Sequence, residues 1–160
     1  MSDPYEFSEA FIDVVANALG KLEHVDHVYK RHMDKSDGSR SAALVLEEWV
    51  PEEYEMTGDG FESATLATYV FNIEYYVKTT DKVDGHRLSR TAAKDIRLML
   101  ERDADLRVAL RQLTERGEDG RIERFQRMPR VSGQRFGDGL IEGQFNYLSA
   151  TTFTIVTETI

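Results

Sequence analysis

Residues 66–79, LATYVFNIEYYVKT, are the stretch that most restricts how this chain can fold. At every second position the side chain is apolar, and the intervening positions mix Thr, Asn, Glu and Lys with Leu, Val and Tyr. Such alternation is typical of a strand with one face on a core and the other partly in water. At ~3.3 Å per residue the stretch spans roughly 46 Å, so part of it is expected to project beyond the domain body. The residues predicted to face the core are Ala67, Tyr69, Phe71, Ile73, Tyr75 and Val77.

Helical periodicity occurs before and after this strand. Asp3-Pro4 reads as a helix start, because Asp accepts backbone N–H groups and Pro suits the first helical position. An apolar stripe with a 3.6-residue period follows in residues 7–22. After a loop at residues 80–85, a second stripe occupies residues 88–100 and a shorter one residues 105–113. These patterns predict an N-terminal helix and a later helix pair, each with its stripe on the sheet.

Strand patterns occur in four further segments, residues 24–33, 41–50, 121–130 and 145–159, of which the first is the weakest. Residues 51–60 break the pattern with Pro, Thr-Gly and Asp-Gly, so they read as the exposed tip of a hairpin that joins two strands. Residues 131–143 hold four glycines and read as a loop or hairpin tip.

The order of these elements defines the predicted fold class. A helix, three strands, a helix pair and two strands form one α+β domain over residues 1–160. We expect a mainly antiparallel sheet of four to five strands, with helices packed on one face and a long projecting β-hairpin.

Composition narrows the function classes. The chain has 160 residues and no Cys, which excludes disulfides and thiolate catalysis. No apolar run approaches the ~20 residues of a membrane helix, and the acidic N-terminus lacks the pattern of a signal peptide. The net charge of −9 argues against a nucleic-acid-binding role, because phosphate contacts require a basic surface.

Charge is distributed unevenly along the chain. Residues 1–80 hold 16 acids and 6 bases, a net of −10, whereas residues 81–160 hold 13 acids and 14 bases, a net of +1. Between Glu47 and Glu62 there are seven acids and no base. This asymmetry bears on association between molecules. The acids of the predicted hairpin region include Glu47, Glu48, Glu52, Glu53 and Glu55.

Arginines in the second half are the predicted counterpart of the acidic run. Those at 121, 124, 127 and 130 recur at every third residue, a period that matches neither a strand face nor a continuous helix face. A nucleic-acid contact, a solvated edge and a contact to an acidic neighbour are the open interpretations, with the first weak beside the net charge. The arginines considered for a subunit contact are Arg97, Arg107, Arg111, Arg121, Arg124, Arg127 and Arg130.

Large side chains surround the acidic run. Trp49, Tyr54, Met56 and Phe61 are candidates for apolar anchors in an interface, since aromatic residues and Met are enriched there. Ordinary core packing of Trp49 is an equally good interpretation of the sequence.

No pattern in the chain predicts catalysis, a cofactor or a metal. His24 and His32 would stand ~26 Å apart in a strand, with His27 on the other face, so the three cannot converge on one ion. Paired carboxylates near residues 47–55 could serve a hydrolase, but nothing fixes two of them at a defined separation. The glycines of residues 133–143 match neither a P-loop nor GxGxxG, and GxSxG and HExxH do not occur.

The order of parts resembles the tail terminator proteins of long-tailed bacteriophages. The resemblance covers nearly the whole chain: a helix, EFSEAFIDVVANAL; a buried strand, AALVLEEWV; a hairpin to ATYVFNIEYYVKT; a helix pair, RTAAKDIRLML and DLRVALRQL; and a closing Thr-rich strand, SATTFTIVTET. It is a resemblance of pattern and size and includes no catalytic motif.

The resemblance implies a structural virion protein rather than an enzyme. Members of the family form a ring, a hexamer in the usual case, that caps the tail tube, ends its polymerisation and offers a surface for joining the head. The implied partners are further copies of the chain, the tail tube protein and head–tail connector proteins, with DNA passing through the lumen non-specifically. No membrane partner and no cofactor are implied. The alternatives are another neck or tail-completion protein and a small carboxylate-based hydrolase.

Overall fold

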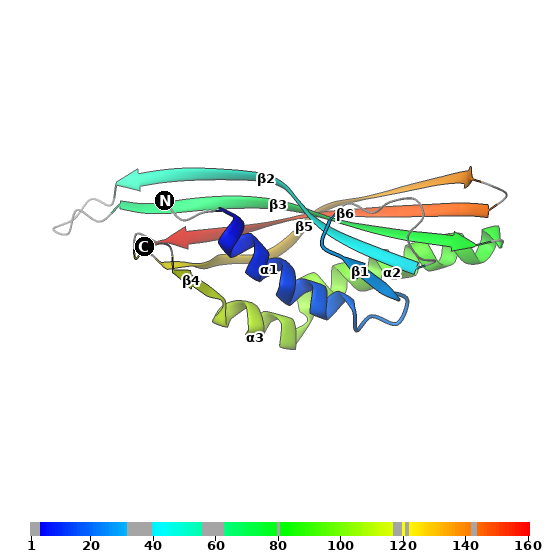
Figure 1. The fold of residues 1–160 in the computed structure, drawn as a ribbon, viewed down its shortest axis with the longest axis horizontal. Coiled ribbons are helices and arrows are strands. Elements are labelled where there is room, and N and C mark those ends of the chain that lie inside the picture. The colour runs from blue at the N-terminus through cyan, green and yellow to red at the C-terminus, as the bar shows by residue number, and fades with distance from the viewer. Residues whose placement is uncertain are drawn as a thin grey trace.

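The computed structural model describes residues 4–31, 40–55, 63–79, 81–116, 120, 122–141 and 144–160. Three helices and six strands make up this part of the chain, and one long sheet runs along the molecule (Figure 1). Within the sheet the strand order is β1-β2-β3-β6-β5-β4. The predicted α+β class is therefore confirmed, with one or two strands more than expected.

The helices lie close to where the apolar stripes place them. α1 spans Pro4–Leu19, α2 spans Lys82–Arg102 and α3 spans Ala104–Gln112. α2 begins inside the segment predicted as a loop, because the Asp81 side chain accepts hydrogen bonds from the backbone N–H groups of Val83 and Asp84. Asp103 ends α2 and caps α3 through the Leu106 N–H, so one residue joins the helix pair.

The strands are longer than the sequence indicated. β2 spans Arg40–Glu55 and continues through Pro51, which the sequence had placed in a tip. β3 spans Ser63–Thr79, and β6 spans Gln144–Thr159. β5 spans Ile122–Ile141, so the glycine-rich residues 131–141 are strand, and their interpretation as a loop is wrong. Pairing with β6 along this whole length supplies the backbone partners that local propensity could not predict.

Two short strands lie at the two edges of the sheet. β1 spans His27–Tyr29 and pairs parallel with residues 41–43 of β2. β4 spans Thr114–Arg116, has no counterpart in the sequence analysis, and pairs antiparallel with residues 122–124 of β5. The sheet is therefore mixed, with the β1–β2 pair parallel and the other pairs antiparallel. β2 and β3 are paired as far as Glu55 and Ser63, and residues 56–62, which include the rest of the predicted tip, lie outside the described residues.

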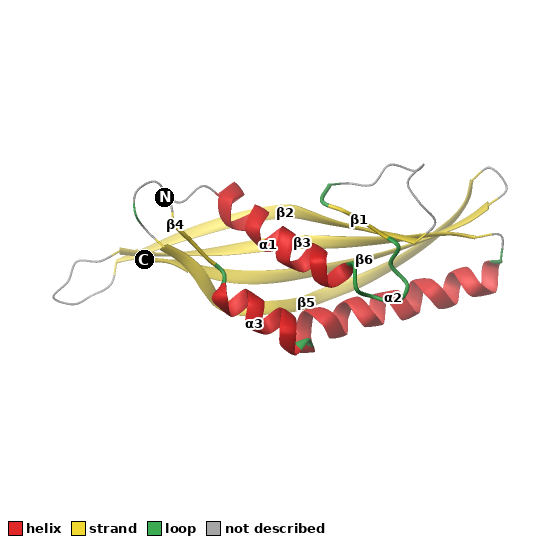
Figure 2. Ribbon diagram, turned by 60° about the horizontal axis from the view of Figure 1, so that its bottom comes forward, coloured by secondary structure: helices red, strands yellow, loops and turns green. Residues whose placement is uncertain are grey.

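All three helices cover one face of the sheet (Figure 2). The β3 side chains on that face, from Ala67 to Val77, are at most 4% exposed. They pack with Phe11, Val15 and Leu19 of α1, and with Ile96 and Leu100 of α2, in one core. The predicted core face of β3 and the helices predicted to cover it are confirmed. Close ring pairs join Phe11 to Phe71 at 4.7 Å and Phe71 to Phe153 at 5.5 Å between centroids.

A buried carboxyl group lies at one end of this core. Glu123 is 1% exposed, and the Tyr69 hydroxyl donates to it at 2.7 Å from Oε2. Thr157 Oγ1 donates to the same oxygen at 3.3 Å. Burial and the adjacent carboxylate raise the pKa of Tyr69 above its ordinary value, so this tyrosine stays neutral and keeps donating.

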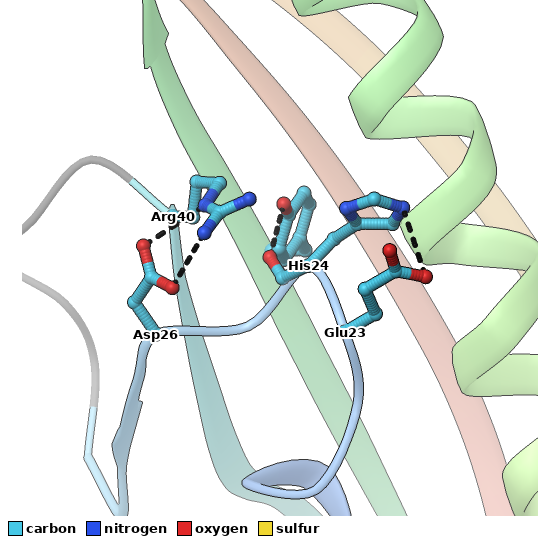
Figure 3. A network of polar contacts seen from close by, with 5 residues as sticks. Glu23, His24, Asp26 and Arg40 are labelled. Carbon is cyan, nitrogen blue, oxygen red and sulfur yellow. Dashed lines mark hydrogen bonds and ion pairs between the residues drawn. The ribbon is translucent and has the colours of Figure 1, made fainter.

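An ion pair anchors the β1 edge (Figure 3). Arg40, the first residue of β2, donates from Nε and Nη2 to the two carboxylate oxygens of Asp26, at 2.9 and 2.7 Å. The hydrogen bonds from Arg40 hold the pKa of Asp26 below its usual value. Two residues before Asp26, the carbonyl oxygen of His24 accepts a hydrogen bond from the Tyr75 hydroxyl at 2.6 Å. The segment between α1 and β1 is thus tied to the sheet by polar contacts.

Candidate assembly surface

The face of the sheet opposite the helices is not covered by any described part of the chain. On β3 and β6 the side chains of this open face are partly exposed, whereas their neighbours along each strand are buried. Val50 and Leu148 reach 39% and 38% exposure. Between them lie mainly Thr and Val side chains, which suit a pleated surface but leave apolar atoms in water. The central residues of this open face are Thr68, Val70, Thr152, Thr154 and Val156.

The strand register explains the three-residue spacing of the arginines. β5 has bulges between Phe125 and Arg127 and between Arg127 and Arg130. Each bulge adds a residue to β5 without advancing β6, so arginines three apart become neighbours on one face. Arg124, Arg127 and Arg130 pair with Glu158, Val156 and Thr154, which are alternate residues on the open face of β6. These three arginines form what we call the arginine row.

The acids of β2 occupy the opposite edge of the same face. Glu48 pairs with Val70, and Glu52 pairs with Leu66, both of which belong to the open face of β3. Glu47 lies at the bulge between Leu46 and Glu48 and is exposed. We call Glu47, Glu48 and Glu52 the acidic edge.

The acidic edge and the arginine row lie at the same heights along the strands. The pairing across β3 and β6 brings Glu48 level with Arg130. In the same way Val50 is level with Arg127, and Glu52 is level with Arg124. Three strand spacings separate the two residues of each such pair, about 14 Å at ~4.8 Å per spacing. The acids therefore cannot pair with these arginines within one subunit.

Further arginines gather on the helix side of the β5 edge. An open hollow of about 550 Å³ is lined by Arg97, Arg102 and Arg107 of the helices, by Glu101, and by residues 128–131 of β5. Arg130, on this edge strand, borders both the hollow and the open face. Glu101 contacts two of these arginines. Its carboxylate lies 3.6 Å from Arg97 Nε, and its carbonyl oxygen accepts a hydrogen bond from Arg107. Four arginines against one acid leave this arginine hollow positively charged.

The structure brings together only some of the residues singled out in the sequence. Arg97, Arg107 and Arg130 meet at the arginine hollow, whereas Arg111 is exposed in the last turn of α3 and does not line it. Arg102 was missed, and its place on the polar side of the second helical stripe is the only signal that could have found it.

Trp49 lies on the covered face. It pairs with Tyr69 and packs against the core, which is the alternative that the sequence left open. Glu53, Tyr54 and Glu55 belong to the strand backbone of β2, and Met56, Phe61 and Arg121 lie outside the described residues. Val50 is the exposed apolar residue that the structure adds to this edge.

Other features offer little chemistry. Among the described residues no three His, Asp or Glu side chains are grouped so that they could hold a metal ion. Glu48 and Glu52 are four strand residues apart, ~13 Å, which exceeds the ~5–9.5 Å that separates the carboxyls of glycosidases. A hollow of about 230 Å³ between α2 and β5 is lined by residues that include His86, Arg90, Phe136 and Tyr147. None of the described helices combines the length and apolarity that crossing a membrane requires.

No protein-family model matches the chain, and no curated protein matches it. Among solved structures, the chain is similar to one from the virion of a native gene transfer agent particle, at 14% sequence identity and a TM-score of 0.40. That similarity covers 96% of this chain and 98% of the other.

Proposed function

We propose that this chain is a structural virion protein that assembles into a closed ring and ends the growth of a tail tube. The observation that carries the proposal is the segregation of acids and arginines to opposite edges of one sheet face. Patches of opposite charge on different sides of a subunit favour a heterologous contact, in which one patch meets a different patch of the neighbour. Repetition of such a contact produces rings when it closes.

The acidic run of β2 is the arm of this contact. In the proposal, the acids from Glu47 to Glu62 reach arginines of the adjacent subunit, either at the arginine row or at the arginine hollow. Exposed ion pairs contribute only ~0.2–1 kcal/mol each, so charge sets orientation while apolar side chains hold the contact. Val50 is one such side chain, and Tyr54, Met56 and Phe61 remain candidates from the sequence.

The tail terminator role rests on the sequence resemblance together with this self-complementary sheet. The ring, a hexamer by resemblance, sits at the head-proximal end of the tail, with the tail tube protein and head–tail connector proteins as its partners. It needs no cofactor and no catalytic residue, and DNA crosses its lumen without specific contacts.

The test measures mass and tube length together. Light scattering of the purified chain, alone and with tubes of the cognate tail tube protein, should show a defined oligomer that binds tube ends. Adding the chain during tube polymerisation should shorten the tubes. A chain that stays monomeric under both conditions and leaves tube length unchanged contradicts the proposal. An oligomer that ignores tubes but binds connector proteins indicates another neck protein.

A further inference from the structure

We infer that neighbouring copies meet without an offset along the strands, so that Glu48 of one copy faces Arg130 of the next. This inference rests on the proposed ring and specifies its contact. The partner is a second copy of this chain, and charge complementarity between the two edges identifies it. Within the described part of the chain, no ion pair is found for Glu48, Glu52, Arg127 or Arg130.

The short edge strands define where the two edges can meet. β1 covers β2 only at residues 41–43, and β4 covers β5 only at residues 122–124. Among the described residues, no strand lies beside the outer edge of β2 from Leu44 onward or beside that of β5 from Phe125 onward. Leu44 pairs with Ile73, and Phe125 is level with Ala67 through the pairing of both with Thr157. The free parts of the two edges therefore lie at the same heights, those of β3 residues 67–73. A neighbour that is not shifted along the strands places its free β2 edge beside the free β5 edge of this copy.

Charges within this window match best without an offset. Glu48 then faces Arg130, Val50 faces Arg127, and Glu52 lies at the height of Arg124, which also contacts Glu158 of its own subunit at 3.5 Å. Shifting the neighbour by two β6 residues in one direction leaves a single match, Glu52 with Arg127, and places Glu48 opposite Gly133. A shift in the other direction also leaves a single match, Glu48 with Arg127, and moves Glu52 past Arg124. Equal heights also mean that each step around the assembly involves no translation along the strands, as a closed ring around an axis parallel to the strands requires.

Side chains rather than a continuous backbone ladder make this contact. β2 has a bulge after Leu46 and a proline at 51, and β5 has bulges around Arg127 and a proline at 129. Bulges and prolines disrupt regular pairing at a sheet edge and protect it from indiscriminate association. The same bulges turn the arginines onto the open face. The β5 edge is thus unsuited to regular pairing with an arbitrary strand, but its arginines suit a partner with acids at the matching heights.

Charge exchange within the intact chain tests the inference. E48R and R130E each place like charges together, so each should raise the protein concentration needed for half-assembly by about tenfold or more. The double variant E48R/R130E restores opposite charges at every contact and should assemble within about threefold of the wild type. An equal mixture of the two single variants should also assemble, because contacts between unlike copies again match opposite charges.

The matched control is E48R/R135E. Arg135 lies on β5 opposite Ala150, two β6 rows beyond Thr152, so this variant carries the same charge change at another height. Mass is measured by sedimentation over a range of concentrations, and circular dichroism melting checks that each variant is folded. Rescue by E48R/R130E and not by E48R/R135E supports the inference.

Three outcomes overturn the inference. If the two double variants assemble equally well and the wild type still forms a ring, the Glu48–Arg130 contact is contradicted and the proposed function is not. If the wild type assembles no further than a dimer, a pair of copies packed through their open faces is indicated. This result contradicts both the Glu48–Arg130 contact and the proposed ring. A wild type that remains monomeric with and without tail tubes also contradicts both.

Discussion

The two faces of the sheet share the same strands and the same register, yet they differ in the burial and packing of their side chains. On the covered face, β3 contributes aromatic and branched side chains that are nearly inaccessible and pack against α1 and α2. On the open face, the same strand contributes Leu, Thr, Val, Asn and Glu side chains that are partly exposed. Stability therefore resides on one face, whereas the proposed contact with a neighbouring copy lies on the other. Mutations on the two faces should separate these properties.

The largest contrast is expected between two adjacent residues of β3. Phe71→Ala removes a fully buried ring that contacts Phe11 and Phe153, and should lower the free energy of unfolding by about 2–5 kcal/mol. Val70→Ala on the open face should cost less than about 1 kcal/mol, because its side chain is already partly exposed. Urea unfolding of both variants measures the difference. Similar losses for the two would contradict the assignment of faces.

Gly85 tests how closely α2 approaches the covered face. A Cβ atom at this position would overlap the Tyr147 ring at Cδ2 and Cε2, which no relaxed structure tolerates. Gly85→Ala must therefore push the helix or the ring away, at a cost of about 1–3 kcal/mol, although Ala normally favours a helix. Gly137→Ala is the control, since nothing lies within 4 Å of the corresponding Cβ position. Thermal melting of both variants should show a loss for Gly85→Ala only.

The buried carboxyl group provides a test of the covered face with an effect of similar size. Tyr69→Phe removes the hydroxyl that donates to both carboxylate oxygens of the buried Glu123, at a cost of about 1–3 kcal/mol. In the double variant Tyr69→Phe with Glu123→Gln, the neutral amide replaces the carboxylate, and part of the loss should be recovered. Absence of any loss in Tyr69→Phe would show that this hydroxyl does not stabilise the fold.

The smallest effect is expected at the β1 edge, where Arg40 pairs with Asp26. The pKa of Asp26 is lowered in the folded chain, so its contribution to stability is present above its unfolded pKa of about 3.8 and is lost as the pH falls through the folded value. The pair is partly exposed, so we expect only ~0.2–1 kcal/mol. Asp26→Asn should lower stability by this small amount at pH 7, converge with the wild type in acid, and so flatten the pH dependence below pH ~4. An unaltered acid profile would contradict this contribution.

Local patterns predicted the covered side of the molecule well. The alternation in residues 66–79 identified the buried side chains of β3, and the apolar stripes located α1, α2 and α3. Period-two and period-3.6 patterns are produced by burial itself, so they can be read without knowing the partner strand. Pro51 and the glycines of residues 131–141 misled the prediction, because pairing of β2 with β3 and of β5 with β6 outweighs their weak strand propensity.

By itself, the sequence determined the α+β class, the core face of β3, the helices that cover it and the separation of acids from arginines along the chain. Only the tertiary structure decided where those charges lie relative to one another. The bulges of β5 turn Arg124, Arg127 and Arg130 onto one face, and pairing across β3 and β6 brings them level with Glu52, Val50 and Glu48. A bulge is defined by the register of two strands that are distant in sequence, and no local pattern of one strand contains that register.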